Sequence, residues 1–290
     1  MNIRTRPAAT RHRRRDVGEW ARRLILVAIA VPWVGVPLWM LLVNSAKPYT
    51  EASQLGLGLP KRWNLVQNYG RVIEQGNYPV ALTNSLLIAI PTLACVIIFG
   101  SMAAWAFARA RGISMKVAYN LSVLSVLLPP AILPTIFELQ VLGIDGSRLG
   151  YFLVLVGTRL GVVVFLATGF IRTMPPDLEE AAAIDGASKA QIYRLLILPA
   201  LLPILLVGGV ILIITIWNEF LFALFLLRGP AAATLPLALY RFSSTSSEFT
   251  AMRWELIFAH VVLTSLPLIM VYLFVQKRLV SGLSEGAIKG

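Results

Sequence analysis

Two charged residues, Arg159 and Glu219, lie within stretches that are otherwise almost entirely apolar. A charge deep in a hydrocarbon layer costs at least about 2.5–3.5 kcal/mol, so each residue needs a partner or water. We expect the two side chains to pair or to face one polar cavity; the alternative is that one of them reaches another subunit.

Trp217 and Asn218 directly precede Glu219 and offer an aromatic face and an amide on one stretch. Aromatic faces bind the C–H surfaces of sugars, and amides bind their hydroxyls. The alternative is that Trp217 packs between helices. With Arg159 and Glu219, these residues are our candidates for lining a solute pathway.

No catalytic or metal-binding set can be assembled from the sequence. The two histidines, His12 and His260, are far apart, and the single cysteine, Cys95, lies in another apolar run. No G-x-x-x-x-G-K-[ST] loop is present to cradle phosphates. We therefore expect neither an enzyme, nor an ATPase site, nor a cofactor within this chain.

Apolar runs long enough to cross a bilayer position these residues. The chain is 57% hydrophobic and 14% charged, whereas soluble domains carry about 25% charged residues. Runs of about 20 apolar residues span a membrane as helix. The sequence predicts an all-α polytopic membrane protein with six transmembrane helices, at 24–43, 80–108, 117–137, 149–171, 199–227 and 256–275.

The basic residues predict the orientation of these helices. Segments 1–23, 109–116, 172–198 and 276–290 hold 17 Lys and Arg, whereas segments 44–79, 138–148 and 228–255 hold 8. The positive-inside rule therefore places both termini in the cytoplasm. The arginine-rich tail, 1–23, fits this role and contact with anionic lipid, and it lacks the aromatic platform of a nucleic-acid binder.

The segment at 175–199, PPDLEEAAAIDGASKAQIYRLLILP, is a polar elbow between the fourth and fifth predicted spans. Asp177 and Glu180 are spaced as a capping box, and Gly186 fits a helix C-terminus. Ser188 and Gln191 repeat the capping pattern, and Pro199 opens the next span. The sequence predicts two short helices joined by a glycine.

The surface of this elbow predicts a protein partner. An interfacial helix under the lipid headgroups is the alternative. However, Glu179, Glu180 and Asp185 would form an acidic face, which is poorly placed beside an anionic leaflet. The alanines at 181–183 would let another surface approach closely. We therefore expect a rigid knob that faces a cytoplasmic protein.

These motifs resemble the EAA loop of permease subunits in bacterial ATP-binding-cassette importers. The matching residues are Glu180, Ala181, Ala182, Gly186, Leu198 and Pro199. The stretches NSLLIA, AFARARG and WNEF, and the ending QKRLVSGLSEGAIKG, are similar to the second permease of maltose-type and multiple-sugar-type importers. The resemblance covers nearly the whole chain from residue 24.

The resemblance implies the type I importer fold, with 80–275 as the transmembrane core and the elbow as a coupling helix. Glu179, Glu180 and Asp185 are then expected to act in this coupling together with the matched residues. The implied partners are a homologous permease subunit, an ATPase dimer that binds ATP and Mg, an extracytoplasmic substrate-binding protein at the loops 44–79 and 228–255, and the lipid bilayer. The tail 276–290 would reach toward the ATPase.

The implied function is ATP-driven sugar import by alternating access across the bacterial cytoplasmic membrane. An importer of the same class for another solute, such as a polyol phosphate or an amino acid, is the alternative. A secondary transporter would need no acidic elbow, and a membrane-embedded enzyme would need a catalytic set.

Overall fold

The protein is helical throughout the part of the chain that the structure describes. This computed structural model describes residues 10–128, 131–246 and 252–287, and no strand occurs among them. The helices are α1 (Thr10–Ala30), η1 (Val31–Gly35), α2 (Val36–Ser45), α3 (Tyr49–Ala52), α4 (Leu65–Gln75), α5 (Tyr78–Arg109), α6 (Ile113–Leu127), α7 (Ile132–Val141), α8 (Arg148–Thr173), α9 (Asp177–Ile184), α10 (Lys189–Ile192), η2 (Tyr193–Ile197), α11 (Leu198–Trp217), α12 (Leu221–Leu226), η3 (Pro230–Ala232), α13 (Leu235–Ser246) and α14 (Trp254–Ala287).

Five helical stretches within the described ranges are long and apolar enough to cross a membrane. They are Arg22–Ser45, Tyr78–Arg109, Arg148–Thr173, Lys189–Trp217 and Trp254–Gln276. The third predicted span, 117–137, is not one straight helix, because α6 and α7 are bent by 118° relative to one another. Counted as one span, this bent pair brings the total to six.

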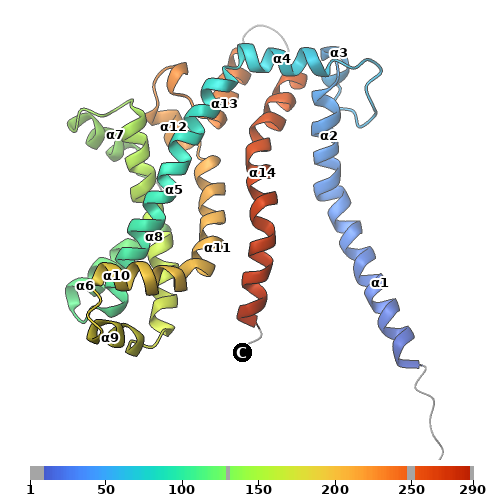
Figure 1. The fold of residues 1–290 in the computed structure, drawn as a ribbon. Helices are drawn as coiled ribbons and strands as arrows, with labels where there is room; N and C mark the ends of the chain where they lie inside the picture. The colour runs from blue at the N-terminus through green and yellow to red at the C-terminus, as the bar shows by residue number, and fades with distance from the viewer. Residues whose placement is uncertain (1–9, 129–130, 247–251, 288–290) are drawn as a thin grey trace, which may run out of the picture. The chain divides into compact units, whose positions relative to one another are not determined.

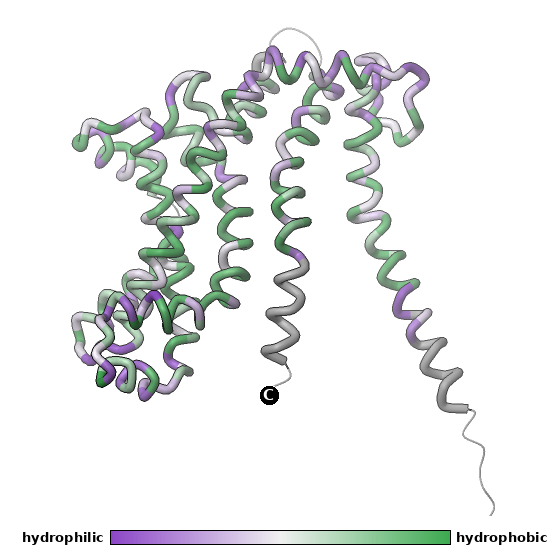
Figure 2. Tube along the Cα trace, viewed as in Figure 1, coloured by the Kyte–Doolittle hydropathy of each residue, from purple (hydrophilic) through white to green (hydrophobic). Residues whose placement is uncertain are grey.

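The chain divides into two compact units, which we describe separately. The larger unit comprises residues 73–244 and 263–290. Its core lies between α5, α8 and α11, whose apolar residues run along most of each helix (Figures 1 and 2). The elbow, α9 and α10, lies at one end of these three helices, and α7, α12 and α13 lie at the other (Figure 1).

Glycines allow close packing around α8. A methyl group built on Gly100 of α5 would lie 2.8 Å from Cβ of Val163 of α8. One built on Gly161 of α8 would collide with the carbonyl oxygen of Ser122 in α6. Small residues commonly bring membrane helices together in this way. The two glycines therefore allow α8 to pack close to α5 and to α6.

The fifth predicted span, 199–227, is interrupted. Helix α11 ends at Trp217, and α12 begins only at Leu221. The hydropathy of 199–227 does not show this break, because the residues of α12 are as apolar as those of α11. Glu219 therefore lies in a non-helical connection. The sequence prediction had placed it inside a continuous helix.

The smaller unit comprises residues 1–72 and 245–262. Its loop after α2, within the predicted outer segment 44–79, is held by side-chain hydrogen bonds. The ammonium of the buried Lys47 donates to the carbonyl of Gly56 at 2.6 Å and to Asn44 Oδ1 at 3.1 Å. The amide of Asn68 donates to the carbonyls of Ser45 and Lys47. These contacts tie the loop to α2 and α4.

Three predicted non-helical segments are partly helical. Helix α1 begins at Thr10, within the predicted tail 1–23. Helix α14 continues to Ala287, so most of the expected C-terminal tail, 276–290, extends the last span. Helix α13 occupies much of the segment 228–255, which the sequence analysis treats as a loop. The polar composition of these segments does not reveal that they form helices.

Candidate functional site: the elbow and the break after α11

The elbow consists of two short helices joined by a glycine, as the sequence predicts. Gly186 has a φ of +84°, a left-handed conformation that residues with a Cβ rarely adopt. Ser188 Oγ accepts the N–H of Gln191, and Gln191 Oε1 accepts the N–H of Ser188. This reciprocal capping box fixes the start of α10 immediately after the glycine turn.

The predicted capping box at Asp177 is wrong. Pro176 is the N-cap residue of α9, and no side chain caps this end. The carbonyl of Pro176 instead accepts the N–H groups of Glu179 and Glu180, which places Asp177 inside the first turn. Its carboxylate there still complements the positive end of the helix dipole.

The second elbow helix runs without a gap into α11. From Lys189 to Trp217 the chain is helical, with a π-helical turn at Tyr193–Ile197. In that turn the N–H of Leu198 donates to the carbonyl of Tyr193, five residues back. Pro199 has no N–H to donate and follows directly, so the wider turn accommodates the start of α11. Any displacement of α10 must therefore act on α11.

Glu179 does not lie on an outward acidic face, contrary to the sequence prediction. Its Oε1 accepts from Arg109 Nε at 2.8 Å and lies 2.7 Å from Arg109 Nη2. Its Oε2 accepts from Trp105 Nε1 at 2.8 Å. Only 13% of its side chain is exposed. The two donors on α5 turn this carboxylate inward, and no local sequence pattern indicates that they lie beside it.

The outer face of the elbow carries large apolar side chains and alanines as well as acidic residues. Leu178 is 53% exposed and Ile184 86% exposed, a large value for isoleucine. The expected outward residues Glu180 and Asp185 are indeed exposed. Among the alanines, those at 181 and 183 are exposed, whereas Ala182 packs against the core. Leu198 is half-buried and Pro199 is exposed.

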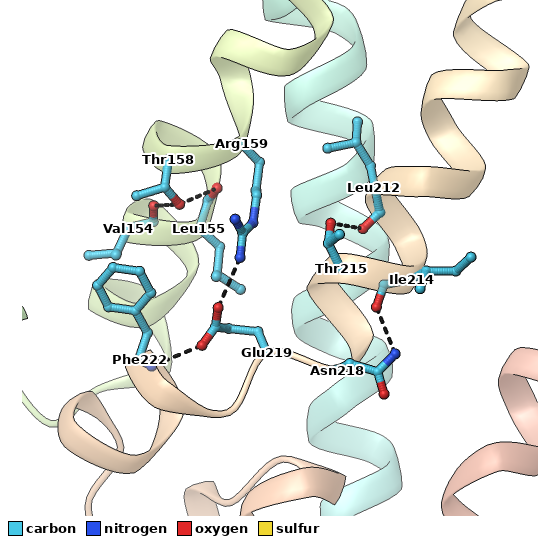
Figure 3. Close-up of polar contacts among 10 residues, drawn as sticks. All are labelled: Val154, Leu155, Thr158, Arg159, Leu212, Ile214, Thr215, Asn218, Glu219 and Phe222. Atoms are coloured by element: carbon cyan, nitrogen blue, oxygen red, sulfur yellow. Dashed lines mark hydrogen bonds and ion pairs between the residues drawn. The ribbon is translucent and has the colours of Figure 1, made fainter. Parts of the chain in front are cut away.

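The predicted pairing of Arg159 with Glu219 is confirmed. Arg159 Nη2 lies 2.9 Å from Glu219 Oε2 (Figure 3). Arg159 is eleven residues from the start of α8, or about 16 Å along its axis. The break after α11 therefore lies at the depth of the middle of α8. The exposed fractions of the side chains, 27% for Arg159 and 10% for Glu219, show that the pair is largely enclosed.

The polar groups of the break are satisfied locally. Glu219 Oε1 accepts the N–H of Phe222, in the first turn of α12, at 2.9 Å (Figure 3). The exposed Asn218 donates its side-chain amide to the carbonyl of Ile214 at 2.9 Å and so caps α11. Non-helical backbone at membrane depth requires such partners. Glu219 thus holds α8, the break and α12 together.

Trp217 packs between helices. It is 5% exposed, and its Nε1 donates to the carbonyl of Thr264 in α14 at 3.2 Å. Its ring therefore offers no open face for a sugar in this conformation, and the packing alternative holds. Among the described residues, no group of His, Cys, Asp and Glu is arranged to hold a metal ion.

Comparison with known proteins assigns the chain to a family. Residues 96–285 match the family described as "Binding-protein-dependent transport system inner membrane component". A probable starch degradation products transport system permease of Thermoanaerobacterium thermosulfurigenes is 31% identical over 91% of this chain and 94% of the relative. A trehalose transport system permease of Mycobacterium tuberculosis is 30% identical over 93% of this chain and 97% of the relative.

A solved structure shares the fold. A bacterial ABC transporter involved in the import of alginate superimposes with a TM-score of 0.76 over 94% of this chain and 99% of that chain, at 21% identity. A structure of a bacterial alginate ABC transporter with its periplasmic protein gives a TM-score of 0.65 at 15% identity. The architecture is thus that of an ABC importer permease, and the chain belongs to the family of inner membrane components of binding-protein-dependent transport systems.

Proposed function

We propose that this chain is one permease subunit of an ATP-driven sugar importer and that the elbow seats a separate ATPase subunit. Relatives are named for the transport of starch degradation products, of trehalose, and of melibiose, raffinose and stachyose. The solved neighbours import alginate, an acidic polysaccharide. A mono- or oligosaccharide is therefore the proposed solute.

The observation that carries the coupling role is the contrast between the two faces of the elbow. The inner face is tied to α5 through Glu179, while the outer face exposes Leu178 and Ile184. Exposed large apolar residues rimmed by charge mark sites of protein association. Glu180 and Asp185 supply that rim, and a partner with basic residues around an apolar recess fits this surface.

The mechanism that follows is alternating access. The ATPase dimer binds ATP and Mg, which this chain does not hold, and its closure draws the elbows of two homologous permeases together. Because α10 is continuous with α11, that movement acts directly on the transmembrane core. An extracytoplasmic binding protein delivers the sugar at the loops 44–79 and 228–255, and both termini lie in the cytoplasm.

The solute pathway passes the break after α11 in this proposal. Asn218 is exposed there, and the partly exposed side chain of Arg159 pairs with the adjacent Glu219 at the depth of the middle of α8. Discontinuous helices near the bilayer middle commonly form transporter sites. Glu219 holds this arrangement in place. Trp217 is not part of the pathway, since its ring is buried.

Co-purification tests this function. The chain, expressed with its native partners, is expected to bring down an ATPase, a second permease and, with solute, a binding protein. In proteoliposomes, one sugar should stimulate ATP hydrolysis and accumulate inside. A panel that includes amino acids and polyol phosphates distinguishes the solute classes. Uptake by vesicles that contain this chain alone would contradict the proposal.

A further inference from the structure

Three residues on one face of α5 contact the elbow. Ser101, Trp105 and Arg109 follow one another at intervals of four, so they line a single stripe of the helix. We call these three residues the α5 stripe. None of them belongs to the elbow, and α5 is joined to α6 and not to the elbow along the chain.

The Arg109 end of the stripe holds the entry to the elbow. Arg109 Nη2 donates to the carbonyl of Met174, the C-cap residue of α8, at 3.1 Å. The same guanidinium binds Glu179 in the first turn of α9. Both oxygens of Glu179 are thereby occupied, because Trp105 donates to the other one. Hydrogen bonds to an ionised group are among the strongest in proteins, and partial burial protects these from water.

The Ser101 end of the stripe holds the exit from the elbow. The hydroxyls of Ser101 and Tyr193 lie 2.8 Å apart. The rings of Trp105 and Tyr193 stack with centroids 6.1 Å apart. Tyr193 begins the π-helical turn that leads into α11. Trp105 therefore contacts α9 through its N–H and, through its ring, the start of the π-helical turn that follows α10.

We propose that the α5 stripe is a second, non-covalent link that transmits movement of the elbow to α5. Covalent connections lead from the elbow only to α8 and α11. The stripe adds α5, which packs closely along α8 at Gly100, so that the three core helices respond to the elbow as one body. Arg109, Trp105 and Glu179 are positioning residues in this scheme. The inference rests on the proposed function, because it concerns how the elbow drives the core.

Variants of Arg109 and Glu179 test the link in the complete complex in proteoliposomes. Arg109→Gln and Glu179→Gln each remove one charge from the pair. We expect the sugar transported per ATP hydrolysed to fall by about tenfold, the factor that a lost charged hydrogen bond typically represents. The ATPase should remain bound and active. The double variant should fall no further, because both residues act through one link.

Matched controls separate this effect from a general loss of charge. Arg111→Gln removes an exposed positive charge two residues after Arg109 and should leave the transport ratio unchanged. Should Arg109→Gln fail to fold, Trp105→Phe is the milder variant, since it retains the ring but lacks the donor to Glu179. A normal transport ratio in a folded and assembled Glu179→Gln or Trp105→Phe complex would overturn the proposal.

A distance measurement reports on the link without relying on ATP hydrolysis. In a Cys95→Ala background, spin labels at Asp177 on α9 and at the exposed Leu87 on α5 give the distance between the two helices. We expect one narrow distribution with Glu179 present and a clearly broader one in Glu179→Gln. An unchanged distribution would refute the link, and so would a broader one combined with normal coupling. If no ATPase co-purifies, the proposed function fails, whereas the spin-label comparison still decides whether the stripe holds the elbow.

Discussion

Two arginine–glutamate pairs hold two interruptions of the helical core, and they differ in how completely they are satisfied. At the elbow, Arg109 and Glu179 lie 2.7 Å apart, the carboxylate also accepts from Trp105, and the guanidinium also donates to the carbonyl of Met174. At the break after α11, Arg159 and Glu219 lie 2.9 Å apart. There Nε of Arg159 is buried and has no hydrogen-bond partner among the described residues.

This difference distinguishes a fixed joint from a site that still has a hydrogen-bond donor available. At the elbow, Arg109 donates its Nε–H to Glu179 within the protein, which suits the coupling role that we propose. The pair at the break keeps a buried donor unused, which is costly unless something else occupies it. A water molecule or a solute hydroxyl would fill this role on the pathway that we propose.

The largest expected loss of unfolding free energy comes from removing one partner of the Arg159–Glu219 pair. Arg159→Met leaves Glu219 charged in an enclosed site, and removing one partner of a buried pair typically costs about 3–5 kcal/mol. Denaturant titration of the purified protein in detergent measures the loss of unfolding free energy. The double variant Arg159→Met/Glu219→Gln should recover most of it. A loss below about 1 kcal/mol in the single variant would show that the pair is solvated.

A smaller loss of unfolding free energy is expected from adding a methyl group where α8 packs against α6. Gly161→Ala places a methyl group against the Ser122 carbonyl, and overpacking of this kind costs about 1–3 kcal/mol. Gly157→Ala, on the same helix with nothing within 4 Å, is the matched control and should be neutral or slightly stabilising. The same titration compares them. Equal behaviour of the two variants would argue against the close approach of α6 and α8.

The smallest effect on stability is expected at the elbow. Gly186→Ala forces a residue with a Cβ to adopt a φ of +84°, at a cost of about 1–2 kcal/mol. Gly186→Asn should cost less, because asparagine tolerates this region. Hydrogen exchange of the α9 and α10 amides is the sensitive measurement. Faster exchange confined to the elbow in Gly186→Ala is the expected result, and unchanged protection would contradict the joint that we describe.

The local parts of both sites could be predicted from the sequence. Gly186, Ser188 and Gln191 determine the glycine turn and the second cap through neighbours only a few residues away. The pairing of Arg159 with Glu219 was also predictable, because charges in apolar stretches have few possible partners. The break after α11 could not be predicted, because α12 continues the apolar run of α11.

The direction of Glu179 could not be predicted, because its partners Trp105 and Arg109 are about 70 residues away along the chain. The acidic cluster therefore suggested an outward face for all three carboxylates. Similarly, the capping role assigned to Asp177 fails because Pro176 already sits at the N-cap. Tertiary contact in one case, and backbone geometry in the other, override the local pattern.

Cross-linking from the outer face of the elbow tests the central claim most directly. In a Cys95→Ala complex, a cysteine at Ile184 carries a photoactivated cross-linker, and a cysteine at Val141 of α7, 87% exposed at the opposite end of the bundle, is the control. The account predicts that position 184 cross-links to the co-purified ATPase, with a yield that changes when ATP is added, and that position 141 does not. An actively transporting complex in which position 184 never reaches the ATPase would contradict it.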